Sequence, residues 1–247
     1  MKKISVLTIF IGIGCWYVAA GLIHNDIILP YPQQVLMQMM QDLQHPNFLK
    51  ILFATVQKTY TAFFYALILG LGAALLAGYV KLIETILQPL VLLFKTVPNI
   101  TYMFLLLLWL PSETAVYYVI FFIIIPVIYT TVLGGMKELD NDLQDVLRLY
   151  PETWFFVLCH VYIPQVYPYL KSAIFATLSL GMKVGVMAEV LGQVRYGIGK
   201  EMYLSKLNLQ MVGVFSWTIW MILLVAVTEW GVKVIFTWLE QRDNRIS

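Results

Sequence analysis

Charged side chains are scarce in this sequence. Only 12% of its 247 residues are Asp, Glu, Lys or Arg, about half of the roughly 25% found in an ordinary soluble domain. Hydrophobic residues make up 60% of the chain, and the mean hydropathy is +0.79. This balance excludes a soluble globular protein and indicates an integral membrane protein. The net charge of only +2, without a long basic run, also argues against nucleic acid as a partner.

Cysteine and histidine, which most often bind metals or form disulfides, are also rare. The two cysteines, Cys15 and Cys159, lie far apart in or beside apolar segments, which favours buried thiols over a disulfide or a metal site. The three histidines are scattered over loops and span ends: His24, His45 and His160. No zinc-protease or nucleophile-elbow motif and no cluster of metal ligands occurs. We therefore expect no metal and no catalysis in this chain.

A nucleotide site is not expected either. The Gly199-Lys200 pair has no glycine five positions before Gly199, and Glu201 stands where a phosphate-binding loop has the Ser or Thr that holds magnesium. We expect no cofactor in this chain.

Long apolar stretches recur through the sequence. Because about 20 apolar residues cross a bilayer as a helix, we expect an all-α membrane protein with about six transmembrane helices in one domain, residues 1–247. The expected spans are residues 4–23, 52–80, 83–110, 115–133, 169–191 and 212–238. Three prolines, at 98, 111 and 126, each remove a helical hydrogen bond and are expected to mark kinks or helix ends.

The first apolar stretch could be a cleaved signal peptide or a retained span. Its length of about 20 residues exceeds the usual hydrophobic region of about 7–15, which favours a retained span. Basic residues near span ends then favour cytoplasmic termini. This orientation places Lys2, Lys3, Lys81, Lys137, Arg148, Arg242 and Arg245 inside, and Lys50, Lys58, Arg195, Lys200 and Lys206 outside.

Two segments between the spans have amphipathic character. Residues 33–43 carry apolar residues at helical spacing and are expected to lie on the membrane surface. Residues 136–165 form a polar loop on the cytoplasmic side, beginning with the hydrophilic stretch 137–151. A short amphipathic helix there either rests on lipid headgroups or binds a soluble partner.

The spacing inside this loop resembles a known signature. Transmembrane permease subunits of binding-protein-dependent ABC importers have a Glu-Ala-Ala triplet, a Gly four positions after it, and Ile-x-Leu-Pro after nine more residues. Here Asp145-Val146-Leu147, Pro151 and Val161-Tyr162-Ile163-Pro164 stand at those positions. Pro151 differs from the family glycine, but it also breaks a helix because it fixes φ and disfavours helical Tyr150.

Further landmarks are similar to the nitrate, sulfonate and taurine branch of this family. They are Leu29-Pro-Tyr-Pro32, Thr55-Val-Gln-Lys58, Gln88-Pro89, Thr96-Val-Pro98, Ile125-Pro126, and Ala188-Glu189 with Gly197-Ile198-Gly199. The resemblance covers about residues 28–245. It implies a type I importer permease in a prokaryotic inner or plasma membrane.

The resemblance also implies partners and coupling residues. Two copies of the permease would pair with two cytoplasmic ATPases, which carry ATP and magnesium, and would receive a small solute from an extracytoplasmic binding protein. The residues expected to couple to the ATPase are Asp145, Val146, Leu147, Arg148, Tyr150, Pro151, Ile163 and Pro164. Relatives carry nitrate, sulfonates, bicarbonate or a pyrimidine vitamin precursor, so the solute stays open.

Ionisable residues and a proline inside the spans suggest a translocation pathway, formed by Lys183, Glu189, Lys95 and Pro98. Lys183 lies deep in the fifth span, where a charge is costly unless it is paired or faces water. We expect it to attract an anionic solute, or else to pair with Glu189 or with a second permease copy. Lys95 lies before Pro98 in the third span, and it either lines the pathway there or snorkels to headgroups. The neighbouring aromatic residues at 63–65 and at 117–118 are expected to anchor the spans at the membrane–water interface.

Two other classes of transporter remain as alternatives. One is the membrane component of an energy-coupling vitamin transporter, which also binds ATPases but lacks a soluble binding protein. The other is a secondary carrier driven by an ion gradient, which would predict an inverted repeat and polar ion sites at mid-membrane.

Overall fold

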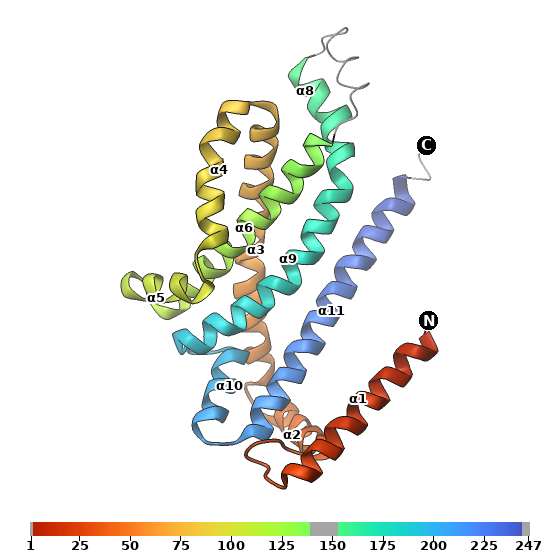
Figure 1. The fold of residues 1–247 in the computed structure, drawn as a ribbon, viewed down its shortest axis with the longest axis vertical. Coiled ribbons are helices and arrows are strands. Elements are labelled where there is room, and N and C mark those ends of the chain that lie inside the picture. The colour runs from red at the N-terminus through yellow and green to blue at the C-terminus, as the bar shows by residue number, and fades with distance from the viewer. Residues whose placement is uncertain (1, 139–152, 244–247) are drawn as a thin grey trace. The chain divides into compact units, whose positions relative to one another are not determined.

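The protein is described here by a computed structural model of residues 2–138 and 153–243, and every element in these two ranges is helical. In chain order the elements are α1 (Lys2–Ile23), α2 (Pro32–Gln44), α3 (Phe48–Tyr79), α4 (Lys81–Thr96), α5 (Asn99–Trp109), α6 (Ser112–Lys137), α8 (Trp154–Val157), the π-helical turn η1 (Leu158–Tyr162), α9 (Ile163–Gly192), α10 (Ile198–Leu207) and α11 (Met211–Asp243) (Figure 1).

Contacts divide the chain into two compact units, and the expectation of one domain over residues 1–247 stays a prediction. The first unit joins Met1–Val56 with Glu189–Ser247, and the second is Gln57–Ala188. The long helices α3 and α9 therefore each contribute residues to both units. Each unit has its own packing, which is described separately below.

In the first unit, α2 and α10 both pack on α11. Helix α2 begins with Pro32 at its first position, and the Tyr31 backbone N–H donates to the Gln34 side chain over 2.8 Å, which caps the helix start. Val35, Met39 and Asp42 form its buried stripe. A second apolar stripe is exposed and consists of Leu36, Met37, Met40 and Leu43. This second stripe suits the predicted location on the membrane surface.

In the second unit, α3 and α6 lie side by side and run parallel. Lys58 forms a 2.9 Å ion pair with Glu113 near the start of α6. Farther along, a Cβ on Gly70 would lie 3.1 Å from Ile128, and a Cβ on Gly78 would overlap Met136. The glycines therefore let the two backbones approach closely, as small residues do in membrane bundles.

Helix α9 packs on this pair through glycines as well. A Cβ on Gly181 would lie 2.8 Å from Ile124, and one on Gly185 would lie 2.9 Å from the Thr59 hydroxyl. The buried core of the unit includes Val116, Ile120 and Ile124 of α6.

The expected third span is not one continuous helix. Residues 83–110 are divided between α4 and α5, whose axes differ by 98°. The break lies at Val97 and Pro98, and Pro111 stands directly before α6, so these two prolines mark helix ends. Pro126 instead lies inside α6, which continues through it.

Among the described residues, four helices are long and apolar enough to cross a membrane. They are Phe48–Tyr79, Ser112–Lys137, His160–Gly192 and Met211–Trp238, and the bent pair α4 and α5 makes a fifth if it counts as one span. In α1 the stretch Phe10–Ile23 forms a shorter apolar helix. The number of six spans therefore stays a prediction.

Candidate functional site

The predicted ATPase-coupling residues fall largely outside the described part of the chain. These residues are Asp145, Val146, Leu147, Arg148, Tyr150 and Pro151. The two remaining residues of the predicted set, Ile163 and Pro164, are the first residues of α9. They directly follow η1, and their role in coupling stays a prediction.

The helix ends that flank residues 139–152 are tied together in the second unit. Glu138, directly after α6, accepts a hydrogen bond from the Tyr169 hydroxyl of α9. Lys137 forms an ion pair with Glu84 in the first turn of α4. Gly135 is buried beneath the Tyr169 ring, which a Cβ at this position would overlap. We call these five residues the flanking clamp. The flanking clamp thus connects α6 with α4 and with α9.

Lys183 has an unusual environment for a charged residue within a span. It is the one exposed side chain between Thr177 and Gly192, and its neighbours Met182 and Val184 are buried. The opposite side of α9 packs against α3 and α6 through its glycines. Because an ammonium in contact with hydrocarbon is costly, this exposed position favours water or a polar partner around Lys183.

Glu189 is fully buried and accepts several hydrogen bonds. The Thr55 hydroxyl lies 3.1 and 3.0 Å from its two carboxylate oxygens, and the Gly199 backbone N–H donates to it over 3.0 Å. The Ile198 N–H in turn donates to the Thr55 hydroxyl over 2.9 Å. Glu189 and Thr55 thus cap the first turn of α10, where a negative charge is favourable. These bonds offset the cost of burying a carboxylate.

Gly197 makes this cap possible. It has φ +155°, and a Cβ at this position would overlap the carboxylate of Glu189. A side chain here would therefore meet both a strained backbone and a steric clash. The five residues Thr55, Glu189, Gly197, Ile198 and Gly199 form what we call the α10 cap.

The four predicted pathway residues lie in different settings. Lys183 and Glu189 are on the same helix, one exposed and the other buried in the α10 cap. Lys95 is exposed in the last turn of α4, and Pro98 is exposed at the break before α5. Their role in a pathway stays a prediction.

A cationic cluster lies close to the α10 cap in the sequence, within the first unit. The Lys50 ammonium lies 3.8 Å from the centre of the Tyr196 ring, and the Arg195 guanidinium lies 5.7 Å from it. Lys200 donates a 3.0 Å hydrogen bond to the Arg195 carbonyl. A hydrogen bond from Lys50 and the charges of Lys50 and Arg195 lower the pKa of the Tyr196 phenol. The cationic cluster is Lys50, Arg195 and Lys200.

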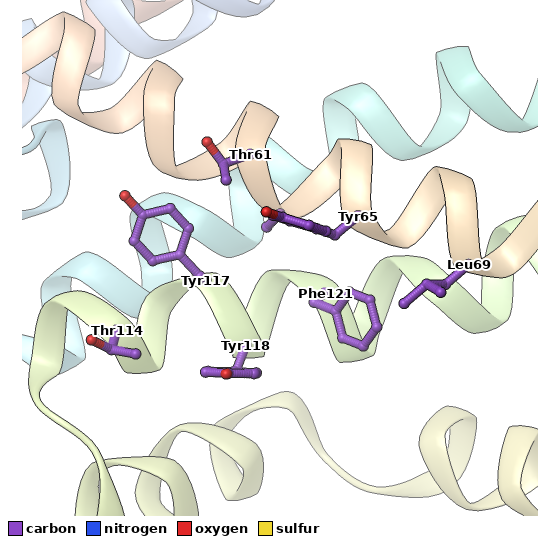
Figure 2. A pocket seen from close by; sticks show the side chains of 8 residues that line it. Thr61, Tyr65, Leu69, Thr114, Tyr117, Tyr118 and Phe121 are labelled. Atoms are coloured by element: carbon purple, nitrogen blue, oxygen red, sulfur yellow. The ribbon is translucent and has the colours of Figure 1, made fainter.

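A pocket of about 470 Å³ lies between α3 and α6. Figure 2 shows its lining side chains on these two helices, and the residues are Thr61, Ala62, Tyr65, Leu69, Thr114, Tyr117, Tyr118 and Phe121. The sequence indicated Tyr65, Tyr117 and Tyr118 only as interfacial anchors. Their convergence was not predictable, because it depends on the parallel register of two helices about 50 residues apart.

Comparison with known proteins places these features in a family context. The sequence pattern of the family described as "Binding-protein-dependent transport system inner membrane component" matches residues 66–241. The chain is 24% identical over 203 residues to the taurine transport system permease protein TauC of Escherichia coli (strain K12), which is 79% of this chain and 74% of that protein. It is also 24% identical over 225 residues to a protein of Bacillus subtilis (strain 168) that is named "Putative aliphatic sulfonates transport permease protein SsuC". This match covers 89% of this chain and 80% of that protein.

A solved structure shares the fold. A chain of the MetNI methionine ABC transporter, captured in inward facing conformations, superposes with a TM-score of 0.60 over 76% of this chain and 95% of that chain. Because only 17% of the aligned residues are identical, this match concerns the fold alone.

Proposed function

Because this chain belongs to the family of inner membrane components of binding-protein-dependent transport systems, we propose that it lines the translocation pathway of an ATP-driven importer for a small anion. The chain is a multi-pass membrane permease with the fold of a type I ABC importer, and it is not an enzyme. The family match also favours this assignment over an energy-coupling vitamin transporter or a secondary carrier.

The anionic character of the solute rests mainly on Lys183. An exposed ammonium within an apolar span suits a water-filled pathway that admits negative charge. In the proposed orientation the cationic cluster faces the extracytoplasmic side, where it would attract the same solutes. Two relatives are named for taurine and aliphatic sulfonates, so a sulfonate is the proposed solute class.

Coupling to ATP is proposed to pass through residues 145–164. Two permease copies would bind two cytoplasmic ATPases, on which ATP and magnesium react, and a soluble binding protein would deliver the solute outside. The flanking clamp supports this assignment, because it connects the residues directly before the segment 139–152 to α4 and α9. Both termini are proposed to be cytoplasmic.

Substitution of Lys183 tests the proposed solute class. In the assembled transporter in proteoliposomes, Lys183→Gln is expected to lower uptake of taurine or a short alkanesulfonate by about tenfold, the equivalent of one charge-assisted hydrogen bond. Lys233→Gln, which removes an exposed lysine from α11, is the matched control and is expected to leave uptake unchanged. Equal uptake by the Lys183 variant and the native complex would refute the role of Lys183 with anions.

A further inference from the structure

The parallel pair α3 and α6 is closely packed along one part of its length and open along another. Gly70 and Gly78 bring the two backbones together toward the end of α3. No glycine occurs at residues 61–69 or 114–121, where large aromatic side chains surround the pocket of about 470 Å³. This volume falls within the range of about 300–1,000 Å³ that is usual for small-molecule sites.

The polarity of the pocket changes steadily along the helix axes. The ion pair of Lys58 and Glu113 connects the two helices just before the pocket begins, three residues before Thr61 and one residue before Thr114. Hydroxyl groups follow, then aromatic rings, then apolar side chains. In that order the lining residues are Thr61 and Thr114, then Tyr65, Tyr117 and Tyr118, then Leu69 and Phe121. Figure 2 shows Thr61 and Thr114 toward one end of the view and Leu69 and Phe121 toward the other.

The length of this gradient matches one leaflet of a bilayer. Lys58 and Leu69 are eleven residues apart on α3, which is about 16 Å along a helix. The hydrocarbon core of a bilayer is about 30 Å thick, so one leaflet, at half this thickness, is about as long as the distance from Lys58 to Leu69. The polar end lies near Ser112, where α6 begins, and is therefore at a membrane surface.

Exposed apolar side chains border the pocket on α3. Tyr65 and Leu69 line the pocket and are 63% and 54% exposed, and their neighbours Phe64 and Ile68 are 55% and 66% exposed. Large apolar side chains with this exposure in a membrane span are suited to contact with lipid tails. An occupant that enters from this side must itself be amphipathic, and a small hydrophilic solute does not meet that condition.

We propose that this pocket binds one phospholipid with a primary ammonium headgroup, of the phosphatidylethanolamine type. The Glu113 side chain is 44% exposed, whereas that of Lys58 is only 6% exposed. The accessible charge at the polar end is thus a carboxylate, which attracts an ammonium and repels a purely anionic headgroup. The hydroxyls of Thr61 and Thr114 can donate to the lipid phosphate, and an acyl chain extends along Tyr65 and Phe121 to Leu69.

Filling the apolar end of the pocket tests the acyl-chain site. Native mass spectrometry of the purified permease, reconstituted in equal parts phosphatidylethanolamine and phosphatidylglycerol and then solubilised, counts the retained lipids. Leu69→Trp is expected to remove one retained lipid per chain. The matched control is Leu76→Trp, because Leu76 is also exposed on α3, at 51%, but does not line the pocket, and it is expected to retain that lipid.

Removing the carboxylate tests the headgroup preference. Glu113→Gln is expected to reduce the preference for phosphatidylethanolamine over phosphatidylglycerol about fivefold, as for one partly exposed ion pair. Since this change leaves Lys58 buried without its carboxylate partner, the double variant Lys58→Met/Glu113→Gln is measured as well. Glu84→Gln, which alters the ion pair with Lys137 in the same unit, is the control and is expected to keep the preference.

Several results would overturn the site. These are an equal lipid count in both tryptophan variants, a headgroup preference that survives loss of Glu113, and displacement of the lipid by taurine, which would assign the pocket to transport. Disulfide cross-linking between cysteines placed at Tyr118 in two permease copies would assign the pocket to a protein interface. None of these measurements requires the ATPase or a binding protein, so their outcome is separate from that of the proposed function.

Discussion

At the scale of single residues, the α10 cap shows how one buried charge organises its surroundings. Glu189 could be identified in the sequence as an ionisable residue near a span end, and it was predicted to lie in the pathway. Its partners could not be identified, because Thr55 is 134 positions away and the Gly199 N–H has no sequence signature. The structure shows these groups holding three helices together.

Gly197→Ala is expected to destabilise the permease. The added methyl group would overlap the Glu189 carboxylate at a backbone φ of +155°, and such strain costs about 1–3 kcal/mol. Thermal unfolding in detergent should show a lower Tm. The control is Gly72→Ala in α3, where a Cβ meets no atom within 4 Å and the change should be neutral or slightly stabilising. Equal melting of the two variants would contradict the described packing of the cap.

Lys58 shows a similar limit of sequence reasoning. The sequence placed this residue among the cations near the outer span ends, without a partner. In the structure it is 5% exposed and paired with Glu113, 55 positions further along the chain. A buried lysine needs such a partner, but only the register of α3 against α6 reveals which carboxylate supplies it.

At the scale of helices, the break between α4 and α5 was predictable but its angle was not. Pro98 indicated a kink or an end in the expected third span, since proline removes a helical hydrogen bond. The turn of 98° is fixed by tertiary contacts. The Tyr102 hydroxyl donates to the Phe94 carbonyl over 3.1 Å across the break, and both rings pack on Phe122 of α6. Such contacts between helices leave no periodic pattern in the sequence.

The flanking clamp leads to a prediction about energy coupling. Tyr169→Phe removes the hydroxyl that donates to Glu138 and so weakens the connection between α6 and α9 beside the coupling segment. The ratio of solute imported to ATP hydrolysed in proteoliposomes is expected to fall about two- to fivefold, as for loss of one surface bond to a charged group.

The control for this prediction is Tyr60→Phe, which removes a phenol hydroxyl from the opposite end of the second unit. It should leave the ratio unchanged. A normal ratio in the Tyr169 variant would show that the clamp does not contribute to coupling.

At the scale of the whole molecule, composition alone predicted the class correctly. The low charge and the long apolar stretches could only belong to an all-α membrane protein, and the family match and the fold confirm it. The division into two units was not predictable. It arises because the first residues of α3 and the last residues of α9 contact the first unit, whereas the rest of both helices belongs to the second unit. The lengths of the apolar stretches in the sequence do not indicate that α3 and α9 are divided between the two units.

Assembly with the ATPase tests the predicted coupling segment. Leu147→Glu places a charge on the expected apolar face of the docking helix. If Leu147 is a buried anchor, its loss should cost at least about 2 kcal/mol of binding, or roughly thirtyfold in affinity. Co-purification of the ATPase with the tagged permease measures this effect.

Leu149→Glu is the matched control, since Leu149 lies in the same segment but outside the predicted coupling set. It should preserve the complex. Retention of the ATPase by the Leu147 variant would exclude this residue from the interface.

The parallel direction of α3 and α6 determines how the residues between these two helices cross the membrane. Lys58 lies level with Glu113, whereas Gly78 lies level with Met136. The chain leaves α3 at one membrane surface and must enter α6 at the opposite one. The bent pair α4 and α5 therefore makes a complete crossing, and it is not a loop that dips into the bilayer and returns. Reagents applied from opposite sides should label cysteines at Val80 and Pro111 separately.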